Sequence, residues 1–214
     1  ILTKKGGNCK LLGKTHFAVG VASSLIFTQP KTVQDVILAV GIGGMGALIS
    51  DIDVDTSGSH KYANRIIAVV VLIVVAVFAA EQIWNAEIVK QIISDSSYAR
   101  IAIGAILFIA ICAFGKQQPH RSFMHSSLAL VLLTASIGMV WQDLIPYFAI
   151  SFASHIIIDM FNFEKVRLLY PFKCGVALKL FHAQGLANNL FFVIGSALAV
   201  IQITICLVRI FFHI

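Results

Sequence analysis

Long apolar runs separated by short polar segments make up most of the chain. A bilayer core about 30 Å thick needs roughly 17 to 25 apolar residues per spanning helix. Six runs approach that length and are predicted to span a membrane: residues 33–50, 65–81, 99–114, 126–141, 144–160 and 188–209. The pattern predicts an all-α fold, a polytopic transmembrane helical bundle.

An earlier apolar segment, residues 15–28, is too short to span comfortably. Thr15 is its predicted N-cap, and Gln29-Pro30 ends it. Gly20 and the small residues after it would permit close approach to other helices. We expect a short, packed seventh helix, and a single domain over residues 1–214 because no linker rich in Pro, Gly or Ser divides the chain.

Charge gives the bundle a predicted orientation. If the crossings alternate, one side receives the N-terminus and residues 51–65, 115–125 and 161–187, and the other side receives only Lys31, Lys90, Arg100 and Arg209 of the 16 basic residues. The positive-inside rule places the basic side in the cytoplasm. The net charge of +6 lies in these short segments, not in a stripe interleaved with aromatics, so nucleic acid is not an expected partner.

The same side gathers most of the histidines and several aspartates. Imidazole nitrogens and carboxylate oxygens are ligands for zinc and other divalent metals. Lys and Arg alone oriented the topology, so this gathering is separate support for a metal site. The four cysteines form no CxxC pair and predict neither a disulfide framework nor a thiolate site. The residues are His16, His60, His120, His125, His155, His182, Asp51, Asp53, Asp55 and Asp159.

Two pairs of these residues have informative spacing. His155 and Asp159 are four residues apart in an apolar run, so one helical face presents both. Ionisable groups there favour a functional interpretation, with a hydrogen-bonded packing pair as the alternative. Asp51 and Asp53 alternate along the chain and can bridge cations, whereas Asp55 alone is better explained as part of a solvated loop.

His120 and His125 lie just before another apolar run. On one continuous helix they would be about 140° apart, so His120 is expected to approach from the loop after Pro119. Arg121 could stabilise an oxyanion or hold a phosphate, or could equally be a positive-inside anchor. His16 opens the short helix, and its value as a ligand depends on the other histidines.

These residues form an ordered set that resembles the YdjM family of bacterial membrane-bound metal-dependent hydrolases over most of the chain. The motifs are Thr15-His16-x-x-x-Gly20, Asp51-Ile52-Asp53, His120-Arg121-x-x-x-His125-Ser126, Ser154-His155-x-x-x-Asp159 and Leu169-Tyr170-Pro171-Phe172. Their ligand order is also remotely similar to zinc-dependent phospholipase C and the P1 nuclease group. The chain departs from the family at Val54, where a His is common, and Asp55 and His60 are the alternative residues to replace it.

The resemblance implies an enzyme of the bacterial inner membrane that holds one to three divalent metals, zinc foremost. It further implies cleavage of a phosphoester in a phospholipid or lipid-linked substrate at the cytoplasmic face. Asp51 or Asp53 would bind metal or accept a proton from water, and Arg121 would stabilise the developing negative charge. The implied metal ligands are His16, Asp51, Asp53, His120, His125, His155 and Asp159.

Two other classes of function stay open at this point. A transporter could use His155 and Asp159 to relay protons or carry a metal, although transporter sites usually lie near the bilayer midplane. A membrane scaffold could use the same residues only to pack its helices. The sequence leaves the oligomeric state and the exact substrate open.

Overall fold

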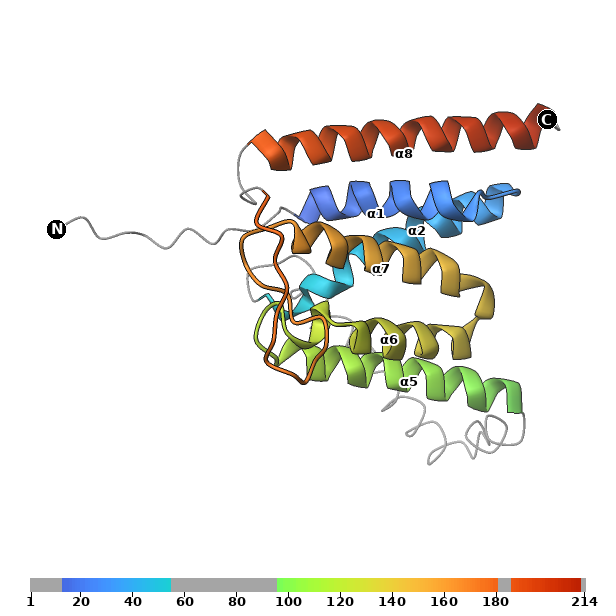
Figure 1. Ribbon diagram of the computed structural model, residues 1–214. Coiled ribbons are helices and arrows are strands. Elements are labelled where there is room, and N and C mark those ends of the chain that lie inside the picture. Colours follow the sequence, from blue (N-terminus) through green and yellow to red (C-terminus); the bar gives the residue numbers. More distant parts are fainter. Residues whose placement is uncertain (1–12, 55–95, 181–185, 213–214) are drawn as a thin grey trace.

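A computed structural model describes residues 13–54, 96–180 and 186–212 of the chain. These residues form six α-helices that lie side by side (Figure 1), with an isolated bridge between Val166 and Val176 as their only β-type pairing. The all-α prediction is therefore confirmed. The helices are α1 (Gly13–Thr28), α2 (Val33–Ile49), α5 (Ser96–Lys116), α6 (Ser127–Val140), α7 (Ile145–Met160) and α8 (Leu186–Phe212).

Within the part of the chain that the structure describes, four segments are long and apolar enough to cross a membrane: Val33–Asp53, Ser97–Lys116, Gln142–Met160 and Leu186–Phe212. The predicted span 126–141 is shorter than expected, because α6 has 14 residues, or about 21 Å of helix, and ends before Trp141. Trp141 has an extended backbone, which stops the helix. The predicted span 65–81 lies outside the described residues.

The short N-terminal helix is present, but its predicted N-cap is wrong. Helix α1 begins at Gly13, and Thr15 lies inside it. The Thr15 hydroxyl instead donates to Asn188 Oδ1 over 2.8 Å in a buried contact with α8. A long-range partner has thus replaced the local capping role that Ser and Thr side chains often take.

Small residues bring α1, α2 and α7 close together. A Cβ at Gly20 of α1 would collide with Ala47 of α2 and Ser151 of α7. The Ser151 hydroxyl donates to the carbonyl of Gly43, again joining α7 to α2. Close backbone approach of this kind is typical of membrane helix bundles. It fixes the relative positions of the helix ends that carry the candidate site.

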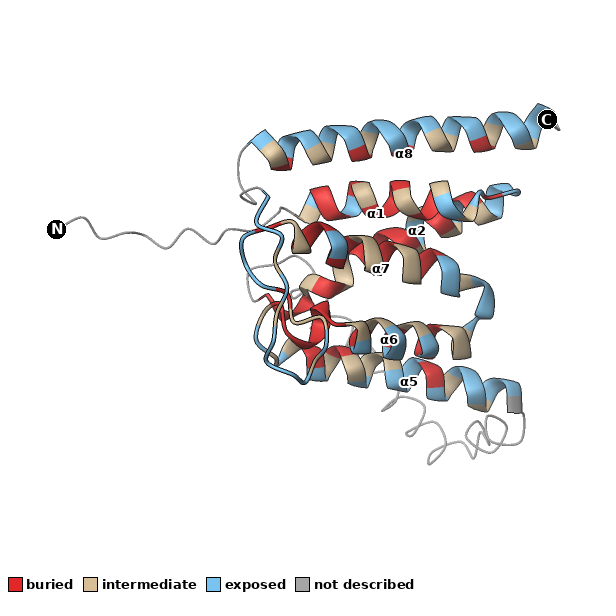
Figure 2. Ribbon diagram, viewed as in Figure 1, coloured by how far each residue is buried: buried red, intermediate tan, exposed pale blue. Residues whose placement is uncertain are grey.

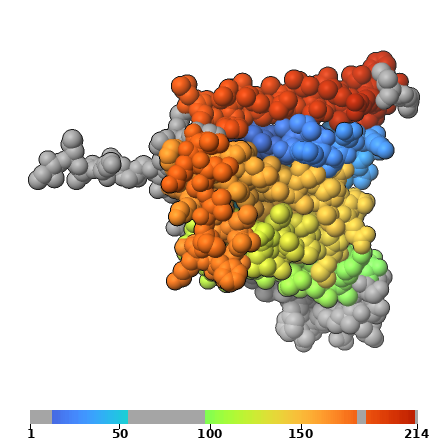
Figure 3. All heavy atoms as spheres, in the orientation of Figure 1, coloured from blue at the N-terminus to red at the C-terminus, as the bar shows by residue number. Residues whose placement is uncertain are grey.

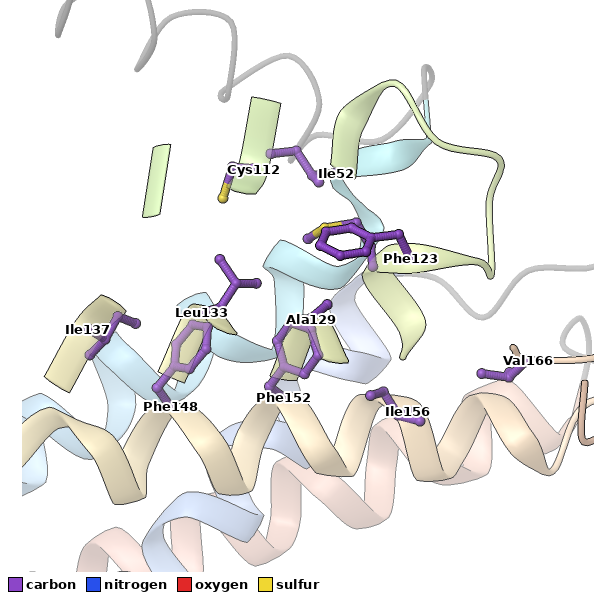
Figure 4. Packing of buried hydrophobic residues seen from close by; sticks show 11 residues of the cluster. Ile52, Cys112, Phe123, Ala129, Leu133, Ile137, Phe148, Phe152, Ile156 and Val166 are labelled. Carbon is purple, nitrogen blue, oxygen red and sulfur yellow. The ribbon is translucent and has the colours of Figure 1, made fainter. Parts of the chain in front are cut away.

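The apolar core extends to the end of the bundle that carries the candidate site. In Figure 4, Phe148, Phe152 and Ile156 lie along one side of α7, with Leu133 and Ala129 of α6 beside them. Buried residues extend toward the N-terminal end of α1 and the C-terminal end of α7, whereas α8 is largely exposed (Figure 2). The exposed apolar side chains of α8 suit contact with lipid.

Candidate metal centre

The structure brings all seven candidate ligands to the same end of the bundle. This follows from the alternation of the helices: α1 begins at that end, α2 and α7 finish there, and α6 begins there (Figure 1). Short 3-10 turns, Ser50–Asp53 after α2 and Phe123–His125 before α6, carry three of them. The residues that meet are His16, Asp51, Asp53, His120, His125, His155 and Asp159.

Their potential ligand atoms form three groups of three. Within each group, the three atoms lie within 4.8 Å of one another. We call His16, His155 and Asp159 the inner group, and Asp53, His120 and His125 the outer group. A middle group consists of Asp51, His155 of the inner group and His125 of the outer group. The inner and outer groups share no residue, so both could hold an ion at once, with Asp51 between them.

The protonation state of His155 can be assigned from its contacts. Its Nδ1 atom lies 2.6 Å from the carbonyl oxygen of Ala47, which can only accept a hydrogen bond, so Nδ1 carries the proton. The lone pair of the neutral ring is therefore on Nε2, the atom that faces the other candidate ligands. A backbone carbonyl that orients a histidine in this way is a common support of metal ligands.

The separations between potential ligand atoms fit a common cation. Tetrahedral ligands at about 2.1 Å from zinc would lie about 3.4 Å from one another. His16 Nε2 is 3.6 Å from Asp159 Oδ1, and His125 Nδ1 is 3.6 Å from Asp53 Oδ2. Each of these two groups supplies three protein ligands, the number found in zinc sites that keep one position open.

Charge and hydrogen bonding also fit a metal. Three carboxylates lie in the cluster. Among the described residues, the Arg121 guanidinium contacts Asp159, whereas the contacts of Asp53 are with His120 and His125. Buried charge without a counterion is costly. Among the described residues, two buried ring nitrogens of the cluster, His16 Nδ1 and His120 Nε2, also have no hydrogen-bond partner.

His125 shows how strongly the surroundings favour positive charge. Burial by itself lowers the pKa of this histidine, but hydrogen bonds and charge from Asp159 and Asp53 outweigh it and raise the pKa above its ordinary value. Its Nε2 atom is 3.1 Å from Asp159 Oδ2, and its Nδ1 faces Asp53. A proton on the ring and a divalent cation are thus alternative ways to neutralise these carboxylates.

The prediction that His120 comes from the loop is confirmed. His120 lies in the turn between α5 and the 3-10 turn at Phe123–His125, and its Nδ1 is 3.0 Å from Asp53 Oδ1. Of the cluster, His120 and Asp51 are the most accessible, with side chains 21% and 14% exposed. Solvent and any substrate therefore meet the outer group and Asp51 before the inner group.

Arg121 is turned toward the protein. Its side chain is buried, with Nη2 3.4 Å from Asp159 Oδ1 and Nη1 donating to the carbonyl of Glu164 over 2.9 Å. These contacts support a role in holding Asp159, and a direct contact with substrate stays a prediction. Glu164 and the Ala47 carbonyl were not predicted from the sequence, although the glycine-rich end of α2 was a signal for close helix contact at Ala47.

Three further predicted residues, Asp55, His60 and His182, lie outside the described residues. Val54, which stands where the resembling family commonly has a histidine, is buried and contributes no ligand atom. The three groups of potential ligands each have three members without these residues.

No curated protein and no solved structure matches the chain. The model of one family, described as YdjM inner membrane protein, matches residues 11–213. That range contains all seven residues of the cluster and nearly the whole sequence. The chain belongs to the YdjM inner membrane protein family.

Proposed function

We propose that the chain is an integral membrane metal-dependent hydrolase acting on a phosphoester of a phospholipid or lipid-linked substrate at the cytoplasmic face. The observation that supports this most is the pair of separate three-ligand groups with Asp51 between them. Three-ligand sites with an open position are typical of catalytic zinc, whereas structural zinc is closed by four protein ligands. Nitrogen and oxygen donors without thiolates also suit zinc among other divalent metals.

A divalent metal at these groups would polarise the scissile bond and lower the pKa of water at the site. Asp51 would accept a proton from the attacking water. Two observations support this role: its Oδ1 lies 3.8 Å from both His125 Nε2 and His155 Nε2, and its side chain is partly exposed. Asp53 orients His120 through their 3.0 Å contact. Arg121 holds Asp159 in place.

The position of the cluster favours a substrate at the membrane surface. It lies at helix ends, where spans such as Val33–Asp53 and Gln142–Met160 terminate, so the accessible ligands are at the level of lipid headgroups. A phosphoester in a headgroup could reach the outer group without crossing the apolar core. The excess of basic residues on this side of the predicted topology supports the cytoplasmic leaflet.

The test combines metal analysis with lipid turnover. Full-length protein purified without chelator is expected to contain divalent metal, and after reconstitution it should release a phosphate-bearing product from inner-membrane lipids. Asp51→Asn should retain metal in the inner and outer groups yet lose turnover at least about 100-fold, as expected for loss of a general base. Gln117→Ala, an exposed change on the same side, is the matched control.

Two results would reject the proposal. Bound metal with no lipid turnover, together with metal uptake into proteoliposomes, would favour a transporter. No bound metal, with unchanged stability after changing His120 and His155 to Ala, would favour a scaffold whose polar residues only pack the helices.

A further inference from the structure

Residues 161–180, which follow α7, form a lobe at the metal-centre end of the bundle. We call residues 161–180 the connecting lobe; it is coloured orange in Figure 3. Its inner side belongs to the core, because Val166 is fully buried and Leu168 and Tyr170 pack against the same cluster. Val166 and Val176 exchange two backbone hydrogen bonds of 2.9 Å, which close the lobe on itself.

Several bonds fix the lobe to the segment that carries the metal-centre residues. The backbone N–H of Arg167 donates to the carbonyl of Arg121 over 3.0 Å. The N–H and the hydroxyl of Ser127 both donate to the carbonyl of Leu168, each over 2.9 Å. With the bond from Arg121 to Glu164, these contacts hold the lobe at a defined place beside the cluster.

The outer side of the lobe combines large apolar side chains with cations. Leu169, Phe172 and Leu180 are 59%, 67% and 67% exposed. Much of the ribbon of the lobe is pale blue, the colour of exposed residues, in Figure 2. Exposed Lys165, Lys173 and Lys179 lie among these residues, and Glu164 is the single acidic residue of the lobe. Soluble proteins rarely expose a large apolar patch to water unless it binds something.

The position of the lobe relative to the bilayer indicates what its outer side contacts. It follows the span that ends at Met160 and precedes the span that begins at Leu186, so it lies where the apolar core of the bilayer ends. We propose that the connecting lobe is a lipid-binding surface, which inserts Leu169 and Phe172 into the headgroup boundary and binds anionic phospholipid headgroups through Lys165, Lys173 and Lys179. Apolar side chains flanked by lysines match the chemistry of an anionic membrane surface.

This surface goes beyond the proposed hydrolase activity and does not depend on it. If the cluster does cleave lipid phosphoesters, the lobe would hold headgroups next to its accessible edge. If the cluster has another role, the lobe still binds lipid. The experiment therefore measures the position of the lobe and its bound lipid, and it does not use turnover.

Depth measurements on nitroxide-labelled protein test the insertion. In full-length protein whose native cysteines are replaced by Ser or Ala, a single cysteine is introduced as Leu169→Cys or Phe172→Cys, labelled and reconstituted in phosphatidylcholine vesicles containing about a third phosphatidylglycerol. Both labels are expected to be more accessible to oxygen, which concentrates in the bilayer, than to a water-soluble nickel chelate. Gln117→Cys, exposed at the same end of the bundle, is the control and should show the opposite preference.

Bound lipid tests the charge. Wild-type protein from mixed vesicles should retain phosphatidylglycerol in preference to phosphatidylcholine, as measured by mass spectrometry of the purified complex. Lys165→Gln, Lys173→Gln and Lys179→Gln together should remove that preference, because each basic residue near an anionic surface contributes about a fivefold gain in binding. Lys31→Gln with Arg209→Gln, at the other end of the bundle, should retain the preference at the lobe.

Either of two results would overturn the proposal. Labels at 169 and 172 that are as accessible to the nickel chelate as the control label would place the outer surface in water. Dipolar broadening between labels on two copies of the chain would assign the surface to a dimer instead of to lipid.

Discussion

The inner and outer groups use the same kinds of side chain in different surroundings. His16, His155 and Asp159 of the inner group are all buried, and Arg121 contacts Asp159. In the outer group His120 is partly exposed, and within the described part of the chain Asp53 contacts the histidines His120 and His125 and no arginine or lysine. The inner group is thus closed and balanced in charge, while the outer group is open.

The difference indicates a division of tasks at one centre. A closed site retains its ion and stabilises the fold, since metal binding to the native state alone adds to folding free energy. An open site exchanges with solvent and can admit substrate. Changes to the inner group should therefore affect stability and metal together, whereas changes to the outer group should affect metal with little effect on stability.

Asp159→Ala is expected to have the largest effect. Asp159 contacts Arg121 and faces all three histidines His16, His125 and His155, so its loss leaves a buried guanidinium without its carboxylate partner. Removing one partner of a buried ion pair costs roughly 3–5 kcal/mol. Denaturant unfolding in detergent micelles should show this loss, and elemental analysis should show the inner metal absent.

The control for this change is Asp143→Ala. Asp143 is exposed at the other end of the bundle, where it accepts a hydrogen bond from Trp141 Nε1. Its removal should leave metal content unchanged and alter the free energy of unfolding by less than about 0.5 kcal/mol. Equal effects of the two substitutions would contradict the closed, charge-balanced picture of the inner group.

His120→Ala should separate the outer group from the inner group. It removes one of the three ligands of the outer group. Removing a residue that only supports a ligand already lowers metal affinity by about 10–100-fold, so the metal affinity of the outer group is expected to fall at least about 100-fold. That corresponds to about 2.7 kcal/mol of binding free energy. Chelator competition measures the affinity; unfolding of the metal-free protein should change by less than about 1 kcal/mol, because His120 is partly exposed.

Much of this centre could be predicted from local spacing and topology. The four-residue separation of His155 and Asp159 put both on one helix face, and alternating crossings put the remaining candidates at the same end. The partners within the centre could not be predicted, because they depend on contacts between distant helices. Thr15 shows the limit: its local sequence indicated an N-cap, but Asn188 of α8 binds its hydroxyl.

Arg121 shows a second limit. The sequence around Arg121 does not show whether its side chain faces the substrate or holds a metal ligand such as Asp159. Its backbone has a positive φ of 60°, and the connecting lobe supplies the Glu164 carbonyl to its guanidinium. Both features depend on how the loop after α5 meets the lobe after α7, which local patterns do not encode.

Gly20→Ala should lower the metal affinity of the inner group, although Gly20 is not one of its ligands. A Cβ there would collide with Ala47 and Ser151, pushing α1 and its His16 away from α2 and α7. Overpacking of this kind costs about 1–3 kcal/mol, and the inner affinity should fall while the outer affinity is retained. Gly41→Ala is the matched control: a Cβ at Gly41 meets no other atom within 4 Å, so it should be neutral or stabilising by up to about 1 kcal/mol.

Arg121→Lys is expected to have the smallest effect and to reveal what Arg121 does. Arginine reaches Asp159 and the Glu164 carbonyl with one planar group, whereas lysine supplies a single point charge that cannot reproduce both contacts. The inner affinity should therefore fall about tenfold, as for loss of a supporting residue, with the outer affinity unchanged. Glu164→Gln, which alters an exposed carboxylate but keeps the backbone acceptor, should leave both affinities intact. A loss of turnover with no change in inner affinity would mean instead that Arg121 acts on the substrate, and the charge balance assigned to the inner group would have to come from another cation.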